Sequence, residues 1–119
     1  MDSSTKPSLT YETSQRGDVV VLALRGRMDA VRVAQVRQVL SDSPQPGKAR
    51  FVLDLAGLEW IDSSGVGALI VLYKRARQLG GDVKVACLQR QPKEIFRLLR
   101  LESAFEVCET VDEAVAKLA

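Results

Sequence analysis

The middle of the chain contains a strand-to-helix corner that restricts the fold more than any other segment. The run Phe51–Leu55 is almost continuously apolar, as in a central parallel strand that is covered on both faces. The turn Ile61–Gly67, with the sequence Ile-Asp-Ser-Ser-Gly-Val-Gly, then leads into residues 66–79, where apolar side chains recur at helical spacing. A buried strand followed by an amphipathic helix predicts an α/β fold.

The polar residues of this turn have two interpretations. Asp62, Ser63 and Ser64 are the residue types that cap a helix by accepting hydrogen bonds from its unpartnered backbone N–H groups. The same N–H groups and the positive end of the helix dipole also bind anions, so a hydroxyl here could carry a phosphate. Gly65 and Gly67 each cost about 0.5–1 kcal/mol in a helix relative to alanine. Two such costs suggest that another backbone, a ligand or a partner comes close.

The rest of the chain predicts a hairpin followed by alternating strands and helices. Residues 1–8 are expected to form a flexible tail, and residues 9–119 a single domain. The predicted strands are 9–13, 19–24, 51–55, 82–88 and 104–109, and the predicted helices are 30–41, 66–79, 92–99 and 111–118. This β-β-α-β-α-β-α-β-α order gives a mixed sheet with helices packed on it. Ser63 and Ser64 would then lie at the carboxyl end of the 51–55 strand, where open α/β sheets bind ligands.

Polar residues also mark the ends of other elements. Asp29 is placed to cap the helix predicted to follow it. Asp54, within an apolar strand, either faces a site at the strand end or is hydrogen-bonded locally. The glycine pair at 80–81 predicts the end of a helix, and residues 110–113 form a capping box that begins the last one.

The absence of histidine excludes several kinds of site. It removes the commonest general base, the commonest metal ligand and the Ser-His-Asp arrangement, so catalysis would have to use carboxylates, lysine or a borrowed cofactor. Cys87 and Cys108 form no CxxC pair and are expected to be buried free thiols. Without clustered acids at ligand spacing, no metal site is expected.

Charge and hydropathy give no indication of a nucleic-acid or membrane partner. The net charge is only +2, and the aromatic residues that single-strand binders interleave with basic ones are missing. No apolar stretch is long enough to cross a bilayer, and the N-terminus lacks the core of a signal peptide, so a cytoplasmic protein is expected. Basic residues on the second and third helices form either a solvated face or a surface that steers an acidic protein. They are Lys74, Arg75, Arg77, Arg90, Lys93, Arg97 and Arg100.

Four segments together resemble a known family. Gly26–Asp29, Leu53–Leu55, the Ile61–Gly67 turn and the helix that ends at the 80–81 glycine pair are similar to those of stand-alone STAS domains, and more narrowly of bacterial anti-sigma-factor antagonists. The similarity extends over residues 8–118, and the Asp-Ser-Ser-Gly-Val-Gly segment is its most specific part. STAS domains fused to transporters often lack the serine pair, so its presence favours the regulatory branch.

The resemblance implies a mechanism. In that family an anti-sigma factor with GHKL-type serine-kinase activity phosphorylates the second serine of the pair, here Ser64. The unphosphorylated antagonist binds the anti-sigma factor and frees a sigma factor, and a PP2C-type phosphatase restores the hydroxyl. Asp29 and Asp62 match acidic positions of the contact surface with the kinase. The partner-binding residues expected on this basis are Asp29, Asp62, Ser63, Gly65, Val66 and Gly67. The chain itself is then expected to have no catalytic activity and no cofactor, and to be a monomer or weak dimer when free.

Electrostatics explains how such a switch would work. A phosphate adds about −1.5 to −2 charges at neutral pH. At a helix N-terminus it should not melt the helix, because the N–H groups and the dipole favour negative charge. Burying that charge against a partner that offers no cation would cost several kcal/mol, which corresponds to a hundredfold or greater loss of affinity.

Two other functions remain as alternatives. A phosphoryl receiver could use Asp54, but it would need an acidic pair after an earlier strand, where only Asp29 is available. A STAS subunit of a larger assembly, of the lipid-transport or stressosome-like kind, would share the fold without phosphorylation of Ser64.

Overall fold

The structure, a computed structural model, describes residues 9–119, so the tail expected over residues 1–8 lies outside the described residues. The strands are β1 (Thr10–Arg16), β2 (Val19–Met28), β3 (Arg50–Asp54), β4 (Leu58–Ile61), β5 (Asp82–Ala86) and β6 (Glu106–Cys108). The helices are α1 (Arg37–Asp42), α2 (Ser63–Gln78), α3 (Arg90–Leu98) and α4 (Val111–Leu118), with 3₁₀ turns η1 (Arg32–Gln35) and η2 (Leu101–Ser103). The predicted mixed α/β fold is confirmed.

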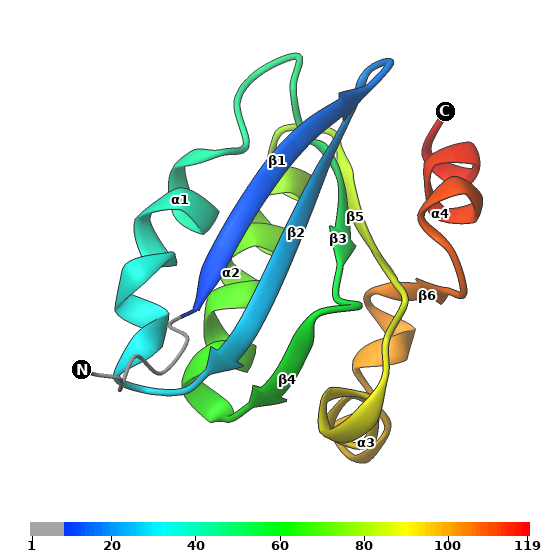
Figure 1. The fold of residues 1–119 in the computed structure, drawn as a ribbon. Coiled ribbons are helices and arrows are strands. Elements are labelled where there is room, and N and C mark those ends of the chain that lie inside the picture. Colours follow the sequence, from blue (N-terminus) through cyan, green and yellow to red (C-terminus); the bar gives the residue numbers. More distant parts are fainter. Residues whose placement is uncertain (1–8) are drawn as a thin grey trace.

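The sheet combines one hairpin with parallel strands (Figure 1). Its order is β1-β2-β3-β5-β6, and β4 pairs with the second half of β2. The β1–β2 pair is antiparallel, as the short connection between them predicted, and every other pair is parallel. The carboxyl ends of β2 and β4 therefore lie side by side, next to the start of α2.

Helices cover both faces of the sheet. Phe51 and Leu53 of β3 face the larger core, which α1, α2 and α3 complete. Val52, which points to the other face, belongs to a smaller core closed by Ala114 and Leu118 of α4. Burial on both sides explains why β3 is apolar almost throughout, as expected for a central parallel strand.

Strand β4 was not predicted, and Ser63 and Ser64 follow the end of β4 rather than the end of the 51–55 strand, as had been expected. Strand β4 has only four residues, and they do not alternate between buried and exposed. Leu58 and Ile61 are buried, while the two residues between them are exposed. Its pairing with β2 is interrupted by a register shift at Gly26, whose φ is +105°. The amide of Gln91 from α3 both donates to the Ile61 carbonyl and accepts from the Ile61 N–H, each at 2.9 Å. A side chain thus takes the place of a further strand at the β4 edge.

The helix predicted over 30–41 is divided into two pieces. The Val36 N–H donates to the Val33 carbonyl, a 3₁₀ bond of η1, whereas the Leu40 N–H donates to the Val36 carbonyl, an α-helical bond. Val33, Val36 and Leu40, which have the apolar spacing that indicated this helix, are all buried. Their spacing of three and then four residues matches the two kinds of helix.

Helix α2 ends where the glycine pair predicted. The Gly81 N–H donates to the Ala76 carbonyl and the Gly80 N–H to the Arg77 carbonyl, with Gly80 at a φ of +85°. This is the hydrogen-bond pattern of a Schellman motif. None of the helices within residues 9–119 is both long and apolar enough to cross a membrane.

Candidate functional site

Asp62 forms the N-cap of α2 and also holds the neighbouring loop. Its Oδ1 accepts hydrogen bonds from the N–H groups of Ser64 (2.9 Å) and Gly65 (3.2 Å). Its Oδ2 accepts from the N–H of Ala30, in the loop after β2, at 3.2 Å. One carboxylate therefore joins the start of α2 to the end of β2, which confirms the capping interpretation for this residue.

The structure explains why glycine is needed at one of the two glycine positions of the turn but not at the other. A Cβ at Gly65 would lie 2.6 Å from the Met28 carbonyl oxygen and 2.7 Å from Cγ1 of Ile61, so the close approach of α2 to β2 requires glycine. A Cβ at Gly67 would meet nothing within 4 Å, and this residue is exposed. Packing inside the chain thus explains Gly65 and leaves Gly67 unexplained.

Ser63 and Ser64 lie at the edge of an open groove. Ser63 is exposed and Ser64 is half-buried in the first turn of α2. Both line a hollow of about 490 Å³ between α1 and α2, here called the α1–α2 groove. The residues that line it are Arg37, Ser41, Ser63, Ser64, Gly67, Ala68 and Val71. The side chain of Ser64 is therefore within reach of another molecule.

Asp29 lies at the same corner as Asp62. It accepts a hydrogen bond from the Arg32 N–H at 2.9 Å, and its Oδ2 pairs with Nη1 of Arg32 at 2.6 Å. The backbone hydrogen bond from Arg32 is the main reason that the pKa of Asp29 lies below its ordinary value. The Asp29 carboxylate thus accepts from the first N–H group of η1, although the N-cap itself is Val31. The structure brings the two predicted acidic residues together at this corner.

Gly65 and Val66 are placed differently from the other predicted partner-binding residues. Both are buried, and the Val66 side chain, 6% exposed, packs into the larger core. They shape the corner from within, whereas Ser63 and Gly67 are exposed on its surface.

Sequence reasoning missed several exposed groups around the corner. Val31 is 80% exposed and directly follows Ala30, which is bonded to the Asp62 carboxylate. The Arg27 guanidinium lies over the Trp60 ring at 4.9 Å from its centroid, in a cation–π contact. Arg37 reaches the groove from α1. The Arg27–Trp60 contact and the place of Arg37 in the groove depend on how separate elements pack, so neither could be predicted from the sequence. Val31 did give a signal, because it is an apolar residue directly after a capping segment.

Other polar groups have local partners. Asp54 accepts a hydrogen bond from the Ala56 N–H at 3.1 Å, which is the local alternative expected for it. Cys87 and Cys108 are free thiols as predicted, although Cys87 is only partly buried, and burial raises the pKa of both. Within residues 9–119, no three His, Cys, Asp or Glu side chains come together as metal ligands would.

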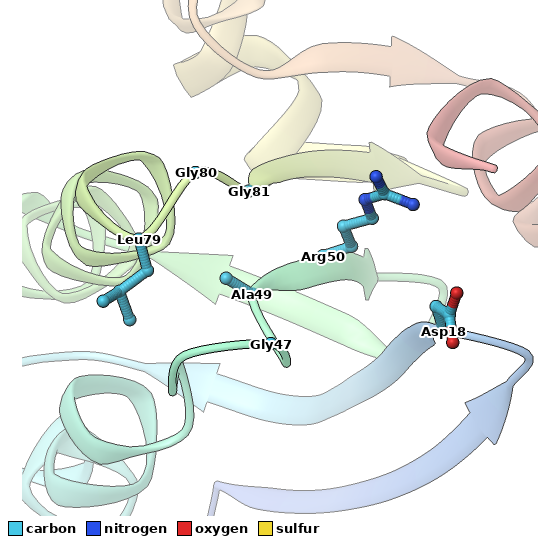
Figure 2. A pocket seen from close by; sticks show the side chains of 7 residues that line it. All are labelled: Asp18, Gly47, Ala49, Arg50, Leu79, Gly80 and Gly81. Carbon is cyan, nitrogen blue, oxygen red and sulfur yellow. The ribbon is translucent and has the colours of Figure 1, made fainter.

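A second hollow lies at the opposite end of α2. It has a volume of about 290 Å³, and Figure 2 shows Asp18 and Arg50 at its edge with the 80–81 glycine pair. The sixteen residues of α2 separate it from Ser64 by about 24 Å. It contains none of the predicted site residues, so the corner at the start of α2 remains the candidate site.

Comparison with known proteins identifies the family. Residues 10–114 match the STAS domain. The chain belongs to the STAS domain family. It is similar to an anti-sigma F factor antagonist of Paenibacillus polymyxa, with 30% identity over 112 residues that cover 93% of each chain. The resemblance to anti-sigma-factor antagonists deduced from the sequence is thus confirmed.

Solved structures share the fold of this STAS protein. An anti-sigma factor antagonist from Mycobacterium paratuberculosis superposes with a TM-score of 0.79 at 23% identity, covering 93% of this chain and 94% of the other. The Bacillus cell fate determinant SpoIIAA, solved in its phosphorylated form, gives 0.71 at 20% identity, covering 92% and 100%. At these identities the similarity concerns the fold.

Proposed function

We propose that this protein is a cytoplasmic anti-sigma factor antagonist whose binding to an anti-sigma factor is switched by phosphorylation of Ser64. The observation that carries the proposal is the position of Ser64, half-buried on the first turn of α2 and open to the α1–α2 groove. The names of its relatives support an anti-sigma factor as the partner. The phosphorylated form of SpoIIAA supports modification as the means of control.

The corner offers a contact surface for such a partner. Asp29 and Asp62 present carboxylates, Ser63 and Ser64 present hydroxyls, and exposed Gly67 lets another backbone approach α2 closely. Burial of Gly65 and Val66 keeps this surface in place. The proposed partner is a GHKL-type serine kinase that recognises the corner as its substrate.

The chain supplies a hydroxyl and no catalytic group. In the kinase step, Oγ of Ser64 forms a bond to the γ-phosphorus of ATP as the bond to the β-phosphate oxygen breaks. ADP leaves, and the hydroxyl proton passes to a base of the kinase. A PP2C-type phosphatase then hydrolyses the ester to serine and inorganic phosphate.

The charge of the corner makes the modification effective. Asp62 and Asp29 already give it two carboxylates, held by hydrogen bonds at 2.6–3.2 Å. A phosphate on Ser64 adds about −1.5 to −2 charges beside them. A partner that fits the unmodified corner would have to bury this charge, at a cost of several kcal/mol. We expect at least a hundredfold weaker binding.

The test is phosphorylation by the candidate kinase with ATP, followed by mass mapping of the modified residue. Ser64→Ala should abolish incorporation and leave binding to the anti-sigma factor largely intact in calorimetry. Ser63→Ala, which removes the exposed neighbouring hydroxyl, is the matched control and should still be modified. Ser64→Asp should weaken binding while the melting temperature shifts by no more than a few degrees.

Two results would contradict the proposal. One is phosphate on a residue other than Ser64. The other is tight binding of the phosphorylated chain to the anti-sigma factor. Recovery of lipid-transport or stressosome-like subunits with unmodified Ser64 would instead favour a STAS subunit of a larger assembly.

A further inference from the structure

Most of the cap of α2 is not available to neutralise a phosphate on Ser64. An anion at a helix start is normally held by the free N–H groups of the first turn. Here Oδ1 of Asp62 already accepts from the N–H groups of Ser64 and Gly65. The Asp62 carboxylate also repels a second anion placed next to it. We therefore expect the phosphate to turn away from the cap, towards the α1–α2 groove that Ser64 lines.

The cations around the corner are not equally available. Arg32 is paired with Asp29 at 2.6 Å, and Arg27 lies over the ring of Trp60 at 4.9 Å. Arg37 is exposed on the first turn of α1 and lines the α1–α2 groove together with Ser64. No carboxylate in the described part of the chain lies within 4 Å of its guanidinium nitrogens.

We propose that Arg37 is the internal receptor for the phosphate on Ser64, pairing with it across the α1–α2 groove. This inference rests on the proposed function in taking Ser64 as the phosphorylated residue. A guanidinium donates two parallel hydrogen bonds to phosphate oxygens, which a lysine cannot do. The hydroxyl of Ser41, on the same wall of the groove, provides a further donor.

The pairing would make the phosphorylated surface different in shape as well as in charge. Phosphate and guanidinium would bridge α1 to α2 and occupy the groove. Gly67, which lines the same groove, would no longer be open to a partner. Helix α1 has six residues and no side-chain N-cap, so a bridge from its first residue should also reduce its fraying.

The experiment uses full-length protein with phosphoserine incorporated at position 64 during translation, so no kinase is needed. Titration followed by ³¹P NMR measures the second pKa of the phosphate, which is about 6 for a free phosphoserine. Arg37 favours the dianion, so Arg37→Gln should raise this pKa by about half a unit, the size of an exposed charge pair. Asp62→Asn, which removes the opposing carboxylate, should lower it. Asp29 and Arg32 contribute little change, because they neutralise each other.

Arg75→Gln is the matched control, because it removes the same charge from an exposed site on α2, outside the groove. It should leave the titration unchanged, and Arg37→Lys should have an intermediate effect. Equal phosphate pKa values in the parent and in Arg37→Gln would overturn the inference. The same holds if Arg37→Gln and Arg75→Gln shift the pKa equally. Failure of a kinase to modify Ser64 would refute the proposed function and leave this result unaffected.

Discussion

The same substitution at two glycines of one helix should change stability in opposite directions. Gly65 and Gly67 are the third and fifth residues of α2. A methyl group at Gly65 would approach the Met28 carbonyl oxygen to 2.6 Å, Cγ1 of Ile61 to 2.7 Å and Cγ of Met28 to 2.9 Å. A methyl group at Gly67 would have open space. The pair therefore separates steric fit from helix propensity.

The magnitudes follow from two effects. Alanine is favoured over glycine in a helix by about 0.5–1 kcal/mol, and Gly67→Ala should raise the free energy of unfolding by about this amount. At Gly65 the same gain is opposed by overpacking, which costs about 1–3 kcal/mol in a close-packed core. The backbone carbonyl of Met28 cannot rotate away as a side-chain end could. Gly65→Ala should therefore lower the free energy of unfolding by about 1–2 kcal/mol.

The assay is equilibrium unfolding in urea, followed by circular dichroism. The midpoint should rise for Gly67→Ala and fall for Gly65→Ala, with the same slope against urea in both. If Gly65→Ala proved as stable as the parent, the steric account of the corner would be refuted. Binding adds a second readout, since Gly67→Ala should weaken the complex with an anti-sigma factor despite its greater stability.

Two further predictions concern the structure that supports the sheet edges. Hydrogen bonds from Lys117 and Lys84 lower the pKa of Glu106 from 4.5 to about 2, so its contribution to stability is present above pH 4.5 and lost as the pH falls towards 2. In Glu106→Gln the urea midpoint should therefore fall less steeply than in the parent as the pH is lowered through this range. An equally steep fall in both proteins would contradict the pairing. Gln91→Ala removes both hydrogen bonds to the Ile61 backbone and should lower the free energy of unfolding by about 1–3 kcal/mol. Hydrogen exchange should become faster for the amides of β4 alone. Unchanged exchange there would show that this edge needs no side-chain partner.

Local chemistry made most of the fold predictable from the sequence. Caps, glycine stops and apolar runs act within a few residues, so the end of α2 at Gly80 and the Asp62 cap follow directly from residue type. One of the two bonds of the predicted capping box at the last helix is present, since the Glu113 N–H donates to the Thr110 hydroxyl at 3.1 Å. Its glutamate carboxylate accepts from the Glu109 N–H, one residue before the expected position.

The features that were not predictable depend on distant partners. Strand β4 exists because the second half of β2 and the side chain of Gln91 are on either side of it, which its four residues do not encode. Arg37 and Ser64 line the same groove only because α1 packs beside α2. Residue types predicted that both serines lie at the start of a helix, with the helix dipole as the receptor for a phosphate. They gave no indication that the Asp62 carboxylate already accepts from two N–H groups at that position.

The occupied cap explains how a charge could be added without disturbing the fold. The bonds that hold the corner run from Asp62 to Ala30, Ser64 and Gly65, and at Ser64 they use the backbone N–H rather than the hydroxyl. Modifying the hydroxyl therefore leaves every one of these bonds in place. A cap that depended on the serine side chain would lose its acceptor on phosphorylation, and α2 would begin elsewhere. Because the capping residue and the residue proposed to be modified are two positions apart, phosphorylation would leave the scaffold constant while the surface changes.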